Sequence, residues 1–355
     1  MKPPFWHLQL RGTARQMGSQ HGEALREQIR ALADERLDII VSSHSSLRVD
    51  VVERCAQEVL LETRRVLPVI FEESQATAHA AGIDHWRLLV AGGFSDIIDT
   101  SLRAVRGSSL EGECTVWPER SSRALRYLVG TWDTHASAAR ALVLVERSPD
   151  RGTPVVALST VGWPMQQGVT DAGLAFTTAN LVASRAYAGT SFICALPNIA
   201  QYASASEAAA RAREIPLCSA RFYALLDQSG GFVALETDGR SFWSRDRQII
   251  HANHFRFSDD PDVEGRFQIV PQSQKRCDAA EAFSGGPVGS GEQILAKLGS
   301  TAGQEIIQSG VGREDRTCAT FVIDPVDRSI YFSPGRPSSG AMWKAQLDVP
   351  PKLVG

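Results

Sequence analysis

One cysteine of this chain has neighbours that suit a nucleophile: Cys114, in the segment LEGECTVW. Gly112 permits unusual backbone dihedrals just before it, and the residues from Thr115 onward begin a β-rich half, so the thiol would be held at the start of a strand. If the bond between Glu113 and Cys114 were cut, the new α-amine, with an ordinary pKa of about 8, could act as general base for the adjacent thiol. Such a nucleophile needs no catalytic histidine.

The alternative for Cys114 is a small buried hydrophobe near a turn, which is a common state of a free cysteine. We give that interpretation to the other cysteines, Cys55, Cys194, Cys218, Cys277 and Cys318. The six cysteines form no CxxC pair and no cluster with histidine, which argues against a zinc site or a disulfide framework. We therefore expect neither a metal nor another cofactor.

A carboxylate is expected to lie close to Cys114 once the chain folds. Asp133, in GTWD, ends what reads as the second of two strands, and a hairpin of these strands would return it to the cysteine. There it could accept a hydrogen bond from the new ammonium group and orient it. The alternative is an aspartate that only caps a turn at a strand end.

Further polar residues stand at strand ends in the same half of the chain. Asn253, in HANHF, could donate a hydrogen bond to a developing oxyanion, and Asn180, in GLAFTTANLV, could bind substrate or assist Asn253. Arg316 precedes an apolar strand, where its guanidinium would suit a carboxylate or carbonyl partner. Thr115, beside the nucleophile, is another candidate for substrate binding. Turn asparagines and a surface arginine are the structural alternatives.

The elements that must hold these residues change in character near residue 107. From Ala14 to about Arg106 the apolar residues recur with a helical period, with an interruption at Pro68 and a further helix or helix pair that begins after Asp84. The rest of the chain is dominated by short β-type runs between turn residues. These runs are RYLVGTWD, ALVLVE, PVVALSTV, GLAFTTANLV, FVALETDG, SFWSRD, QIIHANHF, CATFVIDP and SIYFSPG, with helices at SASEAAARAREIP and SGEQILAKL.

Composition limits the classes of function. The 355 residues are 43% hydrophobic and 22% charged, which suits one large core or two modest ones. The net charge of -3 and the scattered Lys and Arg residues predict neither a nucleic-acid nor a membrane partner. The start of the chain has no apolar signal region, and no run approaches the roughly 18 apolar residues of a spanning helix. We therefore expect a cytoplasmic protein.

Taken in order, the motifs resemble the acyl-coenzyme A:isopenicillin-N (6-aminopenicillanic acid) acyltransferase family, a peptidase C45-like family of the Ntn hydrolase superfamily. The resemblance is carried by GTARQMGSQHGEAL, ECT, WD, DAGLAFTTANL, HANHF, RT before an apolar strand, and SPGRP, and it extends over nearly the whole chain. The wider relatives are the choloylglycine and penicillin V acylases and the β-alanyl-amine hydrolases.

The resemblance implies an α+β fold, a four-layer αββα sandwich with a helical N-terminal segment, that is made as a precursor. Cleavage before the cysteine would separate a helical α-subunit, residues 1–113, from a β-subunit, residues 114–355, and the two would remain together as an αβ heterodimer. By motif, Cys114 is similar to the nucleophile, Asp133 to the aspartate of (N)WD and Asn253 to the asparagine of the oxyanion hole. Arg316 is similar to the arginine before the late strand, and Asn180 to the asparagine of the GLN-type strand.

Three positions depart from the family's pattern. Glu113 stands where the family commonly has glycine, and its carboxylate would disfavour the negative charge that self-cleavage places on the scissile carbonyl. Thr131 stands where the family commonly has asparagine before WD. Bile-salt hydrolases carry an arginine near the position of Gly130, so the sequence does not favour bile-salt hydrolysis.

The predicted activity is that of a self-processing N-terminal-cysteine amidohydrolase or acyltransferase. The Cys114 thiolate would attack an acyl amide or acyl thioester, and the acyl-enzyme would pass its acyl group to water or to an amine. Two rivals remain open. One is a non-catalytic or unprocessed binding protein of the same fold, and the other is an unrelated hydrolase that uses cysteine and histidine without processing.

Overall fold

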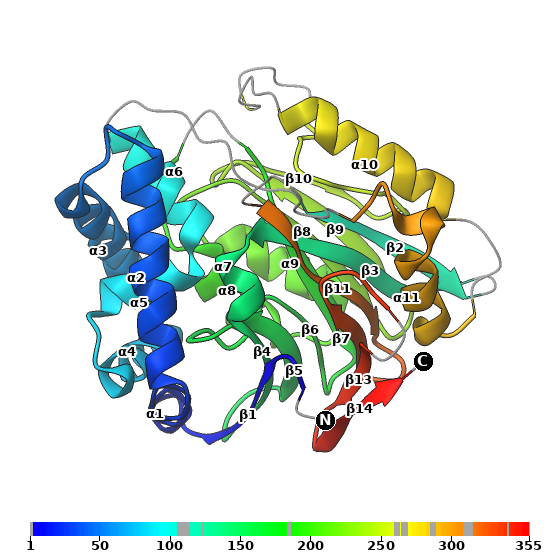
Figure 1. The fold of residues 1–355 in the computed structure, drawn as a ribbon, viewed down its shortest axis with the longest axis horizontal. Helices are drawn as coiled ribbons and strands as arrows, with labels where there is room; N and C mark the ends of the chain where they lie inside the picture. Colours follow the sequence, from blue (N-terminus) through cyan, green and yellow to red (C-terminus); the bar gives the residue numbers. More distant parts are fainter. Residues whose placement is uncertain are drawn as a thin grey trace.

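Two β-sheets packed face to face form the centre of the molecule, and helices cover the outer face of each sheet (Figure 1). The computed structural model describes residues 3–104, 114–121, 124–182, 186–258, 263, 269–284, 289–307, 315–338 and 341–354. The layers therefore follow the order helix, sheet, sheet, helix, which confirms the predicted four-layer αββα fold.

The first sheet has eight strands in the order β1-β4-β5-β6-β7-β8-β9-β10. Neighbouring strands in this sheet are antiparallel, except that β1 runs parallel to β4. The strands are β1 (Trp6–Gly12), β4 (Leu142–Pro149), β5 (Val155–Thr160), β6 (Gln167–Thr170), β7 (Leu174–Asn180), β8 (Arg221–Asp227), β9 (Phe232–Thr237) and β10 (Phe242–Arg245).

The second sheet has six strands in the order β14-β13-β12-β11-β3-β2, and all its neighbours are antiparallel. The strands are β2 (Thr115–Ser121), β3 (Ala124–His135), β11 (Asp315–Asp324), β12 (Ser329–Pro334), β13 (Met342–Gln346) and β14 (Val349–Val354). Beside β2, an isolated bridge joins Val116 to His251, with both backbone N–H···O distances at 2.8 Å.

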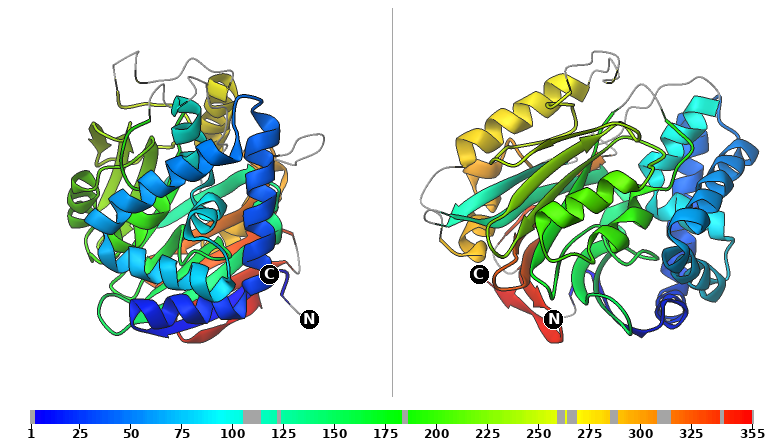
Figure 2. Two further views of the ribbon diagram at one scale, coloured as in Figure 1. Left: turned by 90° about the vertical axis from the view of Figure 1, so that its left-hand side faces the viewer. Right: turned by 180° about the vertical axis from the view of Figure 1, so that it is seen from behind.

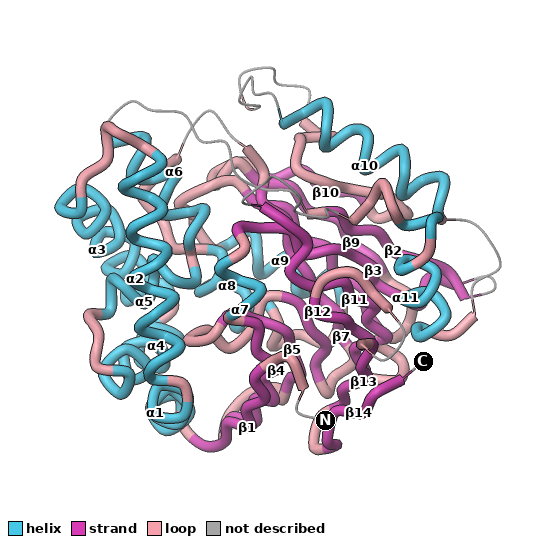
Figure 3. Tube along the Cα trace, in the orientation of Figure 1, coloured by secondary structure: helices cyan, strands magenta, loops and turns pink. Residues whose placement is uncertain are grey.

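Helices form the two outer layers, as the views in Figures 2 and 3 make plain. The first sheet is covered by α1 (Ala14–Ala24), α2 (Arg26–Ser43), α3 (Val49–Val66), α4 (Pro68–Ala81), α5 (His85–Gly92), α6 (Phe94–Ala104), α8 (Phe192–Ile199) and α9 (Ala205–Glu214). The second sheet is covered by α10 (Ile269–Phe283) and α11 (Gly291–Gly299), followed by a 3-10 turn (Thr301–Gly303). A short helix, α7 (Ser137–Arg140), joins β3 to β4.

Local sequence signals set the limits of several helices. Thr13 caps α1 in a capping box with Gln16, and Pro68 takes the first turn of α4, where its missing N–H leaves no hydrogen bond unmade. Gly82 ends α4 in the left-handed conformation, with φ of 70°. In α1, a Cβ on Gly18 would lie 2.1 Å from the Glu73 carbonyl oxygen of α4, so the close packing of these two helices requires glycine there.

The N-terminal segment is an integral part of this fold. It supplies β1 to the first sheet, and its helices share one apolar core with strands and helices beyond Cys114. Two buried ion pairs add to this connection: Glu73 with Arg147, at 2.6 Å, and Asp96 with Arg221, at 2.5 Å. Residues on the two sides of Cys114 therefore fold as one body.

The secondary structure confirms most of the predicted elements and corrects one. QIIHANHF forms no regular strand, since within it only His251 pairs, through its bridge to Val116. Several elements were not predicted, namely β1, β6, β8, β13, β14, α7, α8 and α10. Strand β8 is buried along its whole length and so lacks the alternation of a half-exposed strand, and α10 has only a weak apolar stripe.

None of the helices in the described ranges combines the length and apolar composition that crossing a membrane requires.

Candidate active site

Cys114 lies immediately before β2, at the inner face of the second sheet, and only 6% of it is exposed. Strands β2 and β3 form the predicted hairpin, with Thr115 paired to Thr131. The hairpin brings Asp133 to the cysteine, because the Cys114 thiol lies 3.6 Å from the Asp133 carbonyl oxygen and can donate a hydrogen bond to it. The predicted proximity of these two residues is confirmed.

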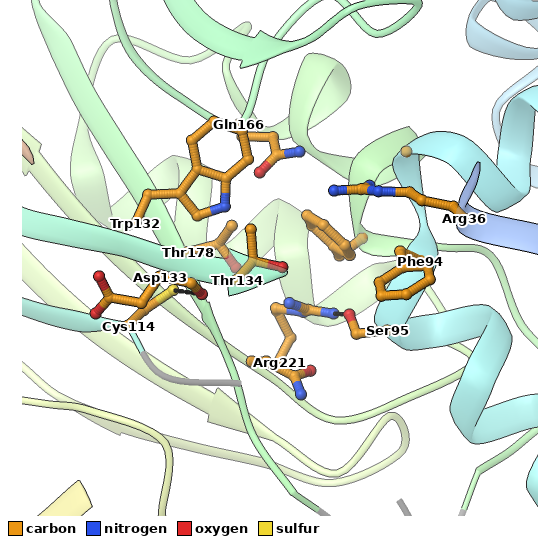
Figure 4. A pocket seen from close by; sticks show the side chains of 13 residues that line it. Arg36, Phe94, Ser95, Cys114, Trp132, Asp133, Thr134, Gln166, Thr178 and Arg221 are labelled. Carbon is orange, nitrogen blue, oxygen red and sulfur yellow. Dashed lines mark hydrogen bonds between the residues drawn. The ribbon is translucent and has the colours of Figure 1, made fainter. Parts of the chain in front are cut away.

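The Asp133 carboxylate points to the opposite face of the sheet from the thiol. Residues paired across strands share a face, as do residues two apart along a strand, so Thr115, Thr131 and Asp133 face outward and Cys114 faces inward. The Thr131 hydroxyl donates to the Asp133 carboxylate at 2.7 Å, and the Thr317 hydroxyl from β11 donates to its other oxygen. Figure 4 shows the carboxylate turned away from the side chains of the pocket.

The thiol opens into a small pocket of about 60 Å³ between the sheets and the N-terminal helices. Its lining includes two buried guanidinium groups and three aromatic rings. The lining residues are Arg36, Gly92, Phe94, Ser95, Cys114, Trp132, Asp133, Thr134, Gln166, Thr178, Asn180, Phe192 and Arg221. A volume of this measure holds a few water molecules or one small polar group.

Burial controls the ionisation of the thiol in the uncut chain. Loss of solvation raises the pKa of Cys114 to about 12, and the negative charge of Asp133 adds to the increase. The positive charges of Arg276 and Arg221 act in the opposite direction. At neutral pH the thiol is therefore protonated, and it is a weak nucleophile in this state.

The two predicted asparagines are in contact, and only Asn180 lines the pocket. Asn180 ends β7 and lines the pocket with Cys114. Asn253 is completely buried outside the lining, and its side-chain amide donates to the Asn180 carbonyl oxygen at 2.8 Å. The Val116–His251 bridge is isolated and does not extend to Asn253, whose backbone N–H donates to the Ser273 hydroxyl at 2.7 Å.

The remaining predicted residues lie further from the thiol. Arg316 is half-buried and pairs with Thr134 across β11 and β3, but it lines a second cavity and is not among the described residues of the Cys114 pocket. Thr115 is fully buried on the outward face of the sheet. Glu113, the residue before the predicted cleavage point, lies outside the described residues.

Comparison with known proteins identifies the family. A family model described as acyl-coenzyme A:6-aminopenicillanic acid acyl-transferase matches residues 119–339, more than half of the chain. The chain belongs to this family. The match confirms the resemblance drawn from the motifs, and membership in an acyl-transferase family indicates chemistry on acyl groups.

Solved structures with related architecture are distant. A mutant of the conjugated bile acid hydrolase from Clostridium perfringens is 10% identical, with 66% of this chain and 92% of that chain covered and a TM-score of 0.46. Penicillin V acylase from Agrobacterium tumefaciens is 16% identical, with coverage of 68% and 79% and a TM-score of 0.33. No curated protein matches the chain.

Both charged arginines of the pocket are among the lining residues that were not found from the sequence. Arg36, on α2, donates to the Ala91 carbonyl oxygen and to the Ser137 hydroxyl at 3.3 Å, and its guanidinium lies over the Phe94 ring at 4.9 Å. Arg221, the first residue of β8, is paired with Asp96 and stacks on the Phe192 ring at 3.7 Å. A buried arginine in a helix has no sequence signature, but the start of β8 would have been a signal if that strand had been predicted.

Gly130, near the position where bile-salt hydrolases carry an arginine, has no space for a side chain. A Cβ at this position would lie 2.7 Å from the Phe321 ring and 2.8 Å from the Thr115 carbonyl oxygen. There is therefore no room for an arginine side chain at Gly130, and the guanidinium groups that line the pocket come from α2 and β8 instead.

Within the described ranges, no group of three or more His, Cys, Asp or Glu side chains is arranged to hold a metal ion.

Proposed function

We propose that the chain cleaves itself before Cys114 and that the new N-terminal cysteine then breaks an acyl amide or acyl thioester bond. The proposal rests above all on the lack of a conventional base at the thiol. No histidine is among the described residues that line the pocket, and the thiol's hydrogen-bond acceptor is a backbone carbonyl oxygen. An α-amine on Cys114 itself would supply the missing base.

Asp133 is the proposed partner of that amine. Continuing the Thr115–Thr131 register toward the start of β2 brings the amino end of Cys114 beside Asp133. Two threonine hydroxyls fix the carboxylate, whose remaining lone pairs can accept hydrogen bonds from an ammonium group. The carboxylate would reach the amine from one face of the sheet while the thiol meets substrate on the other.

In the proposed cycle, protons pass between the Cys114 thiol, its own α-amine and the reacting amines or water. The thiol transfers its proton to the α-amine, and sulfur forms a bond to the acyl carbon. The leaving amine takes the proton from the ammonium group as the amide bond breaks; a thioester would expel its thiol in the same way. Water or an acceptor amine then loses a proton to the α-amine, attacks the acyl carbon and releases the Cys114 thiol.

The charge that develops on the acyl oxygen requires a hydrogen-bond donor. Asn180, on the pocket wall, and Asn253, whose amide contacts Asn180, are the proposed side-chain donors. Arg316 remains a proposed site residue from its motif, and its place in β11 beside Thr317 connects it to the residues that hold Asp133.

The two products of cleavage, residues 1–113 and 114–355, would remain together as an αβ heterodimer. Strand β1 pairs with β4 along seven residues, and the buried pairs Glu73–Arg147 and Asp96–Arg221 cross the cut. Separation would expose the shared apolar core to water, which burial energies of about 25 cal/mol per Å² strongly disfavour.

The experiment is intact-mass analysis of the purified protein after incubation with a panel of acyl amides and acyl thioesters. We expect two chains, and a mass increase equal to one acyl group on the chain that carries Cys114. Cys114→Ala is the control and should stay full length without an adduct. A single uncut chain that never acquires an acyl group would support a non-catalytic binding protein instead.

A further inference from the structure

Arg276 is a buried cation that the proposed cycle leaves unexplained. It lies on α10, the helix that covers the second sheet near β2, and is 2% exposed. Among the described residues its Nε and Nη1 atoms have no hydrogen-bond partner, and no carboxylate pairs with it. Arg147 and Arg221, which are equally buried, each have an ion-pair partner. An unpaired buried charge is unfavourable for stability, so Arg276 calls for another explanation.

The contact that Arg276 does make is with Asn253. Its Nη2 atom donates to the Asn253 side-chain oxygen at 2.6 Å. A guanidinium group has only donors, so this contact fixes which end of the amide faces the helix. The amide nitrogen is consequently directed the other way, where it donates to the Asn180 carbonyl oxygen at 2.8 Å.

Helix α10 holds the same segment at a second point. Three residues before Arg276, the Ser273 hydroxyl accepts a hydrogen bond from the Asn253 backbone N–H at 2.7 Å and contacts the His254 ring at 2.7 Å. Residues three apart share a helix face, so Ser273 and Arg276 form one docking point for residues 253 and 254. Both the backbone and the amide of Asn253 are thus fixed by α10.

A connected series of hydrogen bonds therefore runs from α10 to the thiol pocket. It passes from Arg276 to Asn253 and from Asn253 to Asn180, which shares the pocket wall with Cys114. A hydrogen bond from a charged donor to an amide oxygen polarises the amide and makes its N–H groups stronger donors. The positive charge also lowers the pKa of the Cys114 thiol, against the opposing effect of burial.

We propose that Arg276 is a positioning residue of the acyl-transfer site: it holds the Asn253 amide with its nitrogen on the Asn180 carbonyl oxygen, and it brings a positive charge within two hydrogen bonds of the pocket wall that carries Cys114. The first part of this inference, the positioning of Asn253, rests on the proposed function. The second part, the charge, concerns the thiol alone and is testable without substrate.

The first test is a double-mutant cycle that combines Arg276→Met with Asn253→Ala. With Asn253 present, we expect Arg276→Met to lower turnover about 10- to 100-fold while KM changes less than about threefold, because the contact acts through the oxyanion donor. In the Asn253→Ala background the same substitution should cost less than about threefold. Equal losses in both backgrounds would overturn the positioning role.

Two further variants separate positioning from folding. Arg276→Lys keeps the charge and should recover part of the lost turnover, whereas Lys275→Met, an exposed position next to it on α10, should leave turnover unchanged. Thermal melting of each variant reports stability. If Arg276→Met and Arg276→Lys lose turnover only in proportion to the fraction unfolded, the residue is structural and the proposal fails.

The second test is the rate at which iodoacetamide alkylates Cys114 at pH 8. Charged groups that act on this thiol are Asp133, Arg221 and Arg276, of which the variant removes one. We expect Arg276→Met to slow alkylation about 3- to 10-fold and Lys275→Met to have no effect. An unchanged rate overturns the charge role. If the wild type forms no acyl-enzyme but the alkylation effect is present, the proposed function fails while the charge role of Arg276 stands.

Discussion

The pocket at Cys114 has two walls that come from different parts of the chain. Cys114, Trp132, Thr134 and Asn180 come from the sheets, where strand pairing fixes their positions. The facing wall comes from helices that precede the proposed cut and contributes Arg36 and Phe94 (Figure 4). The first wall holds the groups that can make and break bonds, and the second offers a cation and apolar surface. We infer that the sheet wall performs the chemistry and the helical wall recognises the substrate.

The sharpest test of the chemistry assigned to the sheet wall is Asn253→Ala, because the Asn253 amide donates to Asn180 of that wall. We expect turnover to fall about 100- to 1,000-fold with KM within about threefold, since a lost oxyanion donor acts on the transition state. Asn253→Asp is the matched variant, because it can still accept from Arg276 but has no N–H for the acyl oxygen. Near-normal turnover in both variants would place the donor elsewhere, with Asn180 as the next candidate.

The second prediction concerns the thiol before and after cleavage. With a pKa of about 12 in the uncut chain, its thiolate fraction is very small at neutral pH and rises about tenfold with each pH unit up to that value. A new α-amine would accept the thiol proton, so Cys114 of the cut chain should react with iodoacetamide at pH 7.5 at least about 100-fold faster.

A partly processed sample allows both forms to be alkylated in one tube and compared by peptide mapping. Cys194, whose pKa burial also raises to about 12, is the internal control and should stay unlabelled in both forms. Equal labelling of Cys114 in the cut and uncut chains would contradict the role of the amine.

The sheet wall was largely predictable from the sequence, and the helical wall was not. Strand ends and motif order pointed to Cys114, Asp133 and Asn180, and the β2–β3 hairpin brought the first two together. Asn253 was placed at the end of a strand that does not form, but its side chain still reaches the pocket wall through the Asn180 carbonyl oxygen. Arg36 lies in ADERLDII, which reads as an ordinary amphipathic helix, because its burial depends on how α2 packs against distant segments.

Arg36→Met tests the helical wall. Because Arg36 lies across the pocket from the thiol, we expect KM to rise about tenfold with turnover within about threefold, the pattern of an interaction made equally in ground and transition states. Arg26→Met, an exposed position on the same helix, should change neither constant. A loss confined to turnover would mean that the helical wall takes part in the chemistry, and the division between the walls would fail.

The smallest effect is expected at Thr115. Its hydroxyl faces away from the pocket and has no hydrogen-bond partner among the described residues. Thr115→Val should therefore leave KM and turnover within about twofold and raise the free energy of unfolding by about 1 kcal/mol, since a buried unsatisfied hydroxyl is removed. Steady-state kinetics and chemical denaturation check both values. A several-fold rise in KM would instead support the predicted contact of Thr115 with substrate.

The most direct test is the N-terminus of the mature β-subunit, residues 114–355. The purified wild-type protein, unfolded to separate its chains and examined by intact mass and N-terminal sequencing, should yield a chain that begins CTVWPERS, with a free amine on Cys114. Before unfolding, the two chains should elute together at the size of the whole protein. Active enzyme whose β-subunit begins at any other residue, or an uncut chain with full turnover, would contradict self-cleavage before Cys114.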